Sequence, residues 1–209
     1  MKFEFTAPAR VIFGPGTLTQ AGALAVSLGR RALVVTGRHP ARAQRLLALL
    51  QEHGVATESF AVSGEPTTDV VALGAAAARR FRAELVVGFG GGSPLDAAKA
   101  IAAVAANGGE PLDYMEVVGR GQPLVKPPLP LLAIPTTAGT GSEATPNAIV
   151  LVPEDELKVG IVSPRLVPDA VILDPLLTLT LPAQVTASTG MDALTHAIEC
   201  YCSKKGNPF

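Results

Sequence analysis

The chain has 209 residues, of which 48% are hydrophobic, and its 17 basic and 18 acidic side chains leave a net charge of −1. This apolar content excludes an intrinsically disordered chain, and the balanced charge excludes the clustered positive surface that nucleic acids require. No apolar run reaches the roughly 20 residues that cross a bilayer, and the N-terminus lacks a signal-peptide pattern. Cys200 and Cys202 are too few for a disulfide framework. We therefore expect a cytoplasmic protein with no nucleic-acid or membrane partner.

Short β-branched apolar runs alternate with helical patterns through the first half of the chain. Strands are expected at Ala9–Phe13, Ala32–Thr36, Val55–Val62 and Glu84–Phe89. Helices are expected at Thr17–Leu28, Ala41–His53, Thr68–Phe81 and Ser93–Ala106. This alternation predicts an α/β fold with a doubly wound, mainly parallel sheet of the Rossmann-like kind, joined by right-handed crossovers.

The pattern changes after residue 110. Gly119–Pro130 is rich in glycine and proline and is expected to form a loop. Two further strands are expected at Leu131–Ile134 and Ala170–Leu173. Between them, a hairpin is expected from Ala148–Val152 and Lys158–Val162.

A single helical pattern runs from Pro182 to about Ser203. One helix cannot bury its own apolar face, and this helix carries an apolar stripe formed by Met191, Leu194, Ile198 and Tyr201. We therefore expect an α/β domain over residues 1–181 and the first helix of an all-helical domain over residues 182–209. The chain is expected to be a fragment of a longer protein.

A glycine turn joins the fourth expected strand to its helix. Gly90, Gly91 and Gly92 precede Ser93, which we expect to cap a helix that carries Asp96 in its first turn. Glycines let the backbone approach a ligand closely, and the free N–H groups of a helix N-terminus favour an anion such as a pyrophosphate. A tight turn without a ligand is the alternative, and the spacing differs from the usual G-x-G-x-x-G pattern.

A second Gly-rich stretch, residues 136–143, follows the strand at Leu131 and contains several hydroxyl side chains, so we call it the hydroxyl loop. It formally matches the dinucleotide-binding pattern, but Pro146 and the apolar run after it indicate that no helix follows. We expect a loop at the carboxyl edge of the sheet, where open α/β sheets bind ligands. A solvated loop without a ligand is the alternative.

Asp192 and His196 lie one turn apart on the last expected helix, so they share a face. A carboxylate and an imidazole in this arrangement can reach one divalent ion, but a stable site needs about four ligands. A surface ion pair is the alternative for this pair.

Together these segments resemble the iron-containing (group III) alcohol dehydrogenase family. The resemblance rests on GGGSPLDAAK at 90–99, PTTAGTGSE at 135–143 and GMDALTHAIE at 190–199, in that order along the chain. It implies a nucleotide-binding domain, a helical domain, and an active site between them. It also implies hydride transfer between a nicotinamide cofactor and a small alcohol, aldehyde or ketone at Fe²⁺, or alternatively Zn²⁺. The full-length enzyme is expected to be a homo-oligomer.

The resemblance also implies roles for individual residues, though it assigns no catalytic acid or base in this chain. The glycine turn would hold the cofactor pyrophosphate, the hydroxyl loop would line the cofactor groove, and Lys158 would reach the cofactor from the hairpin. The expected cofactor-binding residues outside the hairpin are Gly90, Gly91, Gly92, Ser93, Asp96, Thr136, Thr137, Thr140 and Ser142. Asp192 and His196 would be two of four metal ligands; the other two would be histidines beyond this chain.

The residues after the second strand bear on the choice between NADP and NAD. NAD-preferring members of the family commonly carry an acidic residue there, whereas this chain has Gly37 and Arg38. Because Arg38 could pair with a 2′-phosphate, we favour NADP. The alternative is a solvated Arg38 and a site that accepts both cofactors.

Other enzymes share this architecture. The enzymatic alternatives are maleylacetate reductase, glycerol dehydrogenase and a dehydroquinate-synthase-like lyase. Asp192 and His196 favour a metal enzyme over the metal-free maleylacetate reductases. A non-catalytic nucleotide-binding fragment is the alternative from another functional class.

Overall fold

A computed structural model describes residues 2–3, 5–204 and 206. In this part of the chain, six strands form one parallel sheet in the order β1-β8-β5-β4-β2-β3. The strands are β1 (Arg10–Phe13), β2 (Arg31–Gly37), β3 (Ala56–Val62), β4 (Leu85–Gly90), β5 (Leu131–Pro135) and β8 (Ala170–Leu173). The expected doubly wound parallel sheet is confirmed. Because β3 lies on one side of β2 and β4 on the other, the chain changes direction at the carboxyl ends of β2 and β4.

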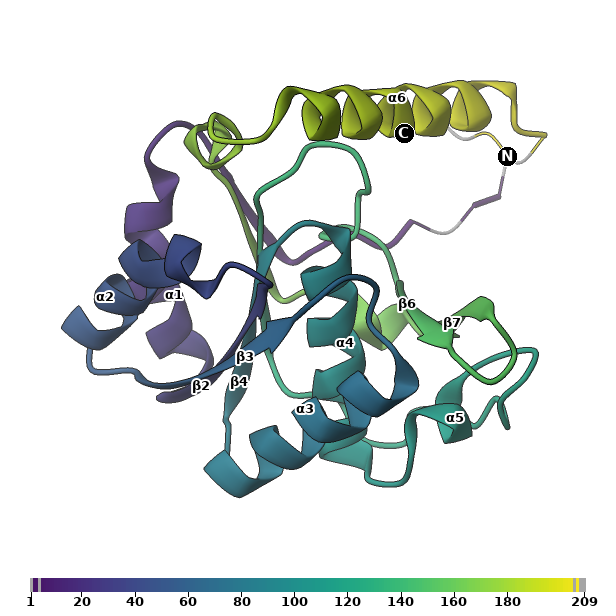
Figure 1. Cartoon of the computed structure of the whole chain (residues 1–209), viewed down its shortest axis with the longest axis horizontal. Coiled ribbons are helices and arrows are strands. Elements are labelled where there is room, and N and C mark those ends of the chain that lie inside the picture. The colour runs from purple at the N-terminus through teal and green to yellow at the C-terminus, as the bar shows by residue number, and fades with distance from the viewer. Residues whose placement is uncertain (1, 4, 205, 207–209) are drawn as a thin grey trace.

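Helices cover both faces of the sheet (Figure 1). One face carries α1 (Ala21–Leu28) and α2 (Gln44–Glu52), and the other carries α3 (Thr68–Phe81) and α4 (Gly92–Asn107). Outside α4 lie α5 (Pro111–Tyr114) and an antiparallel hairpin of β6 (Asn147–Val152) and β7 (Leu157–Val162). Short 3-10 helices are η1 (Thr17–Gln20), η2 (Pro40–Ala43), η3 (Pro164–Leu166) and η4 (Pro175–Thr178).

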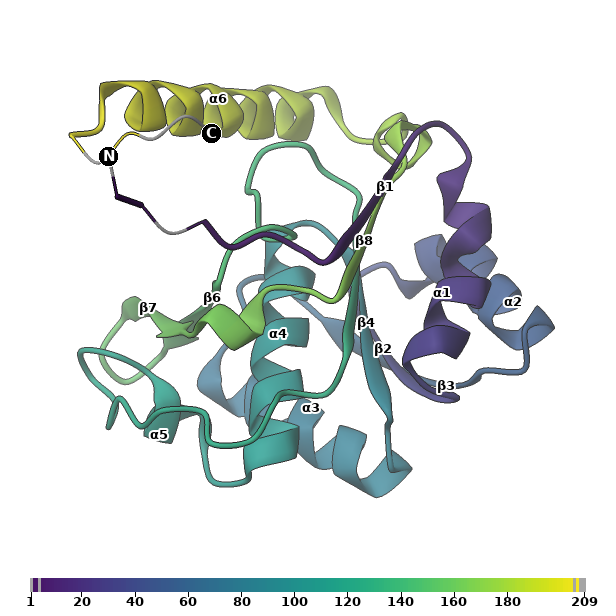
Figure 2. The ribbon, with the colours of Figure 1, turned by 180° about the vertical axis from the view of Figure 1, so that it is seen from behind.

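The two central strands of the sheet are completely buried. Every residue of β4 and β5 is buried, as expected for strands with helices on both faces. Seen from behind, β1 and β8 lie side by side, with β1 at the edge of the sheet opposite β3 (Figure 2). Each face therefore has its own hydrophobic core, and the carboxyl edge between the helix layers stays open for a site.

Several helix starts differ from the sequence-based expectations. The expected helix at Thr17–Leu28 divides into η1 and α1, and the expected helix at Ala41–His53 divides into η2 and α2. The expected cap at Ser93 is wrong because α4 begins one residue earlier, with Gly91 in extended conformation as its N-cap. Asp96 consequently lies beyond the first turn, which contains no acidic residue. The N-terminal N–H groups of α4 thus have no side-chain cap.

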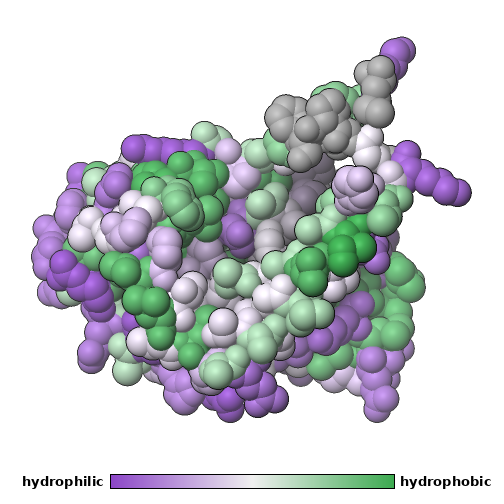
Figure 3. All heavy atoms as spheres, turned by 90° about the horizontal axis from the view of Figure 1, so that it is seen from above, coloured by the Kyte–Doolittle hydropathy of each residue, from purple (hydrophilic) through white to green (hydrophobic). Residues whose placement is uncertain are grey.

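The last helix, α6 (Ala183–Cys202), lies across the top of the molecule, above the carboxyl edge of the sheet (Figures 1 and 2). None of its described residues is buried, and the expected apolar stripe is exposed, from 51% at Leu194 to 92% at Tyr201. Viewed from above, the surface is hollowed beside this helix (Figure 3). None of the helices in the described part of the chain has the length and hydropathy needed to cross a membrane.

Candidate nucleotide and metal sites

A groove of about 450 Å³ lies at the carboxyl edge of the sheet, where the chain changes direction. This is the position at which open α/β sheets bind ligands. The groove runs from the end of β2 past the glycine turn after β4 to the start of the hydroxyl loop after β5, and α6 borders it. Its lining includes seven of the predicted cofactor-binding residues: Gly37, Arg38, Gly90, Gly91, Ser93, Thr136 and Thr137.

The glycine turn is shaped for close approach by a ligand. Gly90 has a φ of +152°, and a Cβ atom on it would lie 2.7 Å from Cγ of Pro94, so the fold requires glycine there. Behind it, Gly91 and Gly92 face the hydroxyl loop. A Cβ atom on Gly91 would lie 3.3 Å from Cγ2 of Thr137, and one on Gly92 would lie 2.9 Å from Cγ2 of Thr140. The hydroxyl loop therefore packs directly on the glycine turn, and Gly91 and Ser93, at the uncapped start of α4, line the groove beside it. Free N–H groups at such a helix start suit a pyrophosphate.

Thr36 is a buried group without a partner in the described structure. Its side chain is 2% exposed, lines the groove, and has an Oγ1 atom with no hydrogen-bond partner in the described part of the chain. Leaving a buried hydroxyl without a partner costs about 1–3 kcal/mol.

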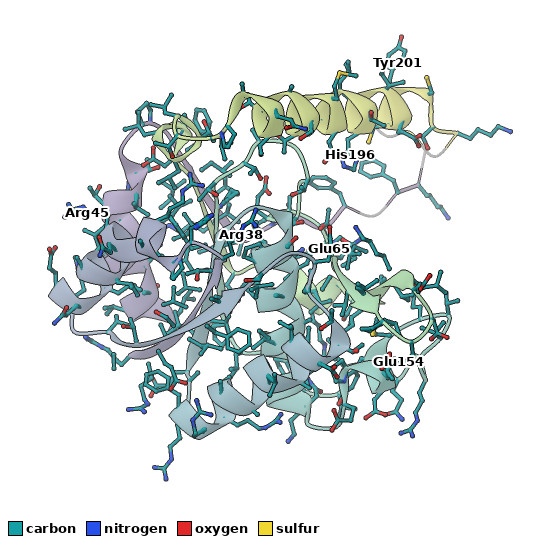
Figure 4. The ribbon with its side chains drawn as sticks, viewed as in Figure 1. Arg38, Arg45, Glu65, Glu154, His196 and Tyr201 are labelled. Atoms are coloured by element: carbon teal, nitrogen blue, oxygen red, sulfur yellow. The ribbon has the colours of Figure 1, made fainter. Side chains whose placement is uncertain are left out.

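Basic side chains surround the end of the groove nearest β2. Arg38, His39 and Arg42 line it, and no acidic side chain is among the described residues that do so. Nη2 of Arg42 donates a hydrogen bond to Oγ1 of Thr180 at 2.8 Å, which fixes this guanidinium beside the groove. Arg38 points from the end of β2 towards the space below α6 (Figure 4). This end of the groove suits an additional negative charge.

Asp96 lies behind the groove and contacts the hydroxyl loop. Its carboxylate accepts hydrogen bonds from the side chain of Ser142 and from the backbone N–H of Ile149. Burial raises the pKa of Asp96 to about 6, although the positive charge of Lys99 and the two hydrogen bonds act in the opposite direction. Ser142 is itself buried. Asp96 and Ser142 thus join α4 to the loop, and neither is among the residues that line the groove.

Lys158 lies on β7, where its Nζ atom forms an ion pair of 2.9 Å with Oε1 of Glu65. Both side chains are about half exposed. Lys158 is not among the residues that line the groove, although Gly64, the residue before Glu65, is. Its predicted contact with the cofactor therefore stays a prediction.

Asp192 and His196 lie on α6 as predicted, with Nε2 of His196 3.5 Å from Oδ1 of Asp192. His196 points from α6 towards the α/β domain, whereas Tyr201 points away from it (Figure 4). The side chain of Asp192 is 43% exposed and that of His196 is 61% exposed, so both can accept further contacts. No group of three or more His, Cys, Asp or Glu side chains that could hold a metal occurs among the described residues. The pair supplies two converging ligand atoms of the kinds that Fe²⁺ and Zn²⁺ accept.

Some groove residues could not be found from motifs. Thr36, Arg42 and Val185 come from three separate elements, and only the fold brings them together. Lys99 did carry a signal, because it is the one charged residue in the apolar run 97–106. A charge within an apolar run could have indicated a buried lysine, but not its contacts.

Comparisons with known proteins agree on the family. The model of the family described as iron-containing alcohol dehydrogenase matches residues 8–175. The chain is 37% identical over 213 residues to the 1,3-propanediol dehydrogenase of Klebsiella pneumoniae, covering 99% of this chain and 54% of that protein. Among solved structures, a 1,3-propanediol oxidoreductase matches with a TM-score of 0.93 at 37% identity, covering 100% of this chain and 55% of the other.

A further solved structure carries a cofactor. The sulfoacetaldehyde reductase of Bifidobacterium kashiwanohense, in complex with NAD⁺, matches with a TM-score of 0.90 at 32% identity, covering 100% of this chain and 55% of that one. The chain belongs to the iron-containing alcohol dehydrogenase family. It spans about half the length of the curated relatives that it matches.

Proposed function

We propose that this chain forms the nicotinamide-nucleotide half of an iron-type alcohol dehydrogenase. The observation that supports the proposal most strongly is the groove at the change of chain direction, where the uncapped start of α4 faces the hydroxyl loop across Gly91 and Gly92. In the complete enzyme, hydride would pass between a small alcohol or aldehyde and the nicotinamide ring. A relative of this chain is named for 1,3-propanediol and another binds NAD⁺ in its crystal.

We propose an orientation for the cofactor in the groove. The pyrophosphate would lie on the N–H groups at the start of α4, near Gly91 and Ser93. The adenosine ribose would lie at Gly37 and Arg38, at the end of β2. The nicotinamide half would then extend along Thr136 and Thr137 towards α6.

We propose that the site prefers NADP to NAD. Arg38, His39 and Arg42 line the ribose end of the groove, with no acidic side chain among the described lining residues. A 2′-phosphate adds negative charge, which an arginine can bind through two parallel hydrogen bonds.

We propose that residues 1–181 form the nucleotide-binding domain and that residues 182–209 belong to a helical metal-binding domain. Two observations support this division: no described residue of α6 is buried, and the curated relatives are about twice as long. Asp192 and His196 would hold Fe²⁺, or alternatively Zn²⁺, together with ligands from outside this chain. Such an ion, when bound, polarises the substrate oxygen. We further propose that the enzyme is a cytoplasmic homo-oligomer; the two free cysteines suit a reducing compartment.

Calorimetric titration of the 209-residue chain with NADPH and NADH tests the proposed function. We expect weak binding of both, tighter for NADPH, and no alcohol turnover, because the described residues supply two metal ligands. Gly91→Val should weaken binding by at least about tenfold, since its side chain would press on Thr137 where both residues line the groove. Gly190→Val is the matched control, because nothing lies within 4 Å of a Cβ atom there. A folded chain that binds neither nucleotide contradicts the proposal.

A further inference from the structure

Lys99 is a buried cation on α4, the helix whose first residues line the proposed nucleotide groove. Its side chain is 1% exposed on α4, in a run of alanines and other apolar residues. Three oxygen atoms surround its Nζ atom: the carbonyl of Thr145 at 2.7 Å, Oγ1 of Thr145 at 3.1 Å and the carbonyl of Asn147 at 2.9 Å. A lysine ammonium group has three N–H donors, so each oxygen can accept one. The site therefore matches the charged form of Lys99.

No carboxylate in the described structure lies within ion-pair distance of Lys99. Burying a charge is costly unless other groups compensate it. The three oxygens that compensate this charge belong to the segment that leaves the hydroxyl loop and enters β6. Lys99 thus attaches the outgoing end of the loop to α4.

A second attachment lies one turn earlier on α4. There, Asp96 accepts hydrogen bonds from the side chain of Ser142 and the backbone of Ile149. Thr137 and Thr140, at the other end of the same loop, pack directly over Gly91 and Gly92. The position of these hydroxyls relative to the glycine turn therefore depends on how the far end of the loop is held.

We propose that Lys99 is a positioning residue for the nicotinamide half of the nucleotide site: its buried ammonium group holds the hydroxyl loop against α4. This inference rests on the proposed function, which places the nicotinamide half along Thr136 and Thr137. The adenosine half lies at the end of β2, which is a different element. Loss of the Lys99 contacts should therefore weaken binding of the nicotinamide half and leave binding of the adenosine half unchanged.

The charged groups around Lys99 define its titration. Asp96 on the same helix and Glu143 on the loop favour its charged form. Arg165 and Asp169, from η3 and the segment before β8, line a cavity together with Lys99. Burial outweighs the two carboxylates and lowers the pKa of Lys99 to about 8. A neutral amine has two N–H donors for the three oxygens, so one contact is lost above this pH.

The test compares two probes on Lys99→Met: NADPH, and 2′,5′-ADP, which contains the adenosine half alone. We expect Lys99→Met to bind NADPH about tenfold more weakly than the wild-type chain, and 2′,5′-ADP within about twofold of it. Lys126→Met is the matched control, because Lys126 is exposed, and both affinities should be unchanged. Thr145→Val, which removes one of the three oxygens, should weaken NADPH binding alone by about two- to threefold. If Lys99→Met does not fold, the effect of Thr145→Val on the two probes tests the proposal instead.

The pH profile separates positioning from general stabilisation. Between pH 7 and pH 9, NADPH affinity of the wild-type chain should fall towards that of Lys99→Met, which should show no such change. Equal losses for both probes, no loss for either, or parallel pH profiles would overturn the role of Lys99. Failure of the wild-type chain to bind either probe would instead overturn the proposed function.

Discussion

Gly37 ends β2 at the point where we place the adenosine ribose. A Cβ atom built on it would lie 3.7 Å from Cγ of Pro94, an ordinary contact, and its φ is not in the left-handed region. The backbone therefore tolerates a side chain at this position. Glycine here leaves room for a ligand, which makes the position a suitable test of cofactor choice.

Gly37→Asp should reverse the preference for NADP. The new carboxylate would repel a 2′-phosphate and could accept a hydrogen bond from a ribose 2′-OH. We expect NADPH affinity to fall by at least about tenfold and NADH affinity to stay the same or rise. Calorimetry with both cofactors measures the ratio. An unchanged ratio in a folded variant would show that the ribose does not lie at residue 37.

Individual residues show where sequence reasoning succeeded and where it could not. The motif at residues 90–93 predicted the glycine turn correctly, because strand, glycines and helix are consecutive in the chain. It misplaced the cap, because Gly91 and Ser93 both fit a helix start and only the backbone conformation decides between them. The contacts of Lys99 with Thr145 and Asn147 span 46 and 48 residues, so no local pattern contains them.

At the scale of elements, α6 is a helix whose apolar side chains remain exposed in the described structure. Its apolar side chains at Met191, Leu194 and Ile198 are more than half exposed, and Tyr201 points away from the domain (Figure 4). Exposed apolar surface of this kind favours self-association. The sequence predicted this helix and its stripe from periodicity alone.

Shortening the chain to residues 1–181 should give a better-behaved domain. Because no described residue of α6 is buried, we expect the melting temperature to change by less than about 4 °C. Light scattering should report less self-association for the shorter chain. Hydrogen exchange on the 209-residue chain should show α6 exchanging much faster than the sheet. Exchange of α6 as slow as that of β4 in the monomer would mean that the helix is firmly docked.

At the scale of the whole molecule, the proposed metal site would combine Asp192 and His196 with ligands from outside the described structure. In a longer protein that contains this chain, His196→Ala should remove the metal and abolish alcohol turnover, while NADPH affinity stays within about twofold. Metal content by elemental analysis and nucleotide affinity by calorimetry check the two halves of this prediction. Retention of metal in the variant would show that His196 is not a ligand. Thr195→Ala is a neighbouring control on the same helix.

The sequence was enough to predict a parallel, doubly wound sheet. The order of the strands within the sheet could be found only from the structure. Alternating strands and helices indicated a parallel doubly wound sheet, because parallel neighbours need crossovers. The insertion of β8 between β1 and β5 depends on contacts between residues about 160 positions apart, such as Val11 with Val171. The turn after β1 depends on Asp174 in the same way, since its carboxylate accepts from the backbone N–H groups of Gly16 and Leu18.

A crystal structure of the 209-residue chain with NADPH tests the central claim most directly. We expect the pyrophosphate on the backbone N–H groups at the start of α4, with the 2′-phosphate beside Arg38 and the nicotinamide along Thr136 and Thr137. A nucleotide bound in the reverse direction, or outside the groove at the ends of β2 and β4, would contradict the claim.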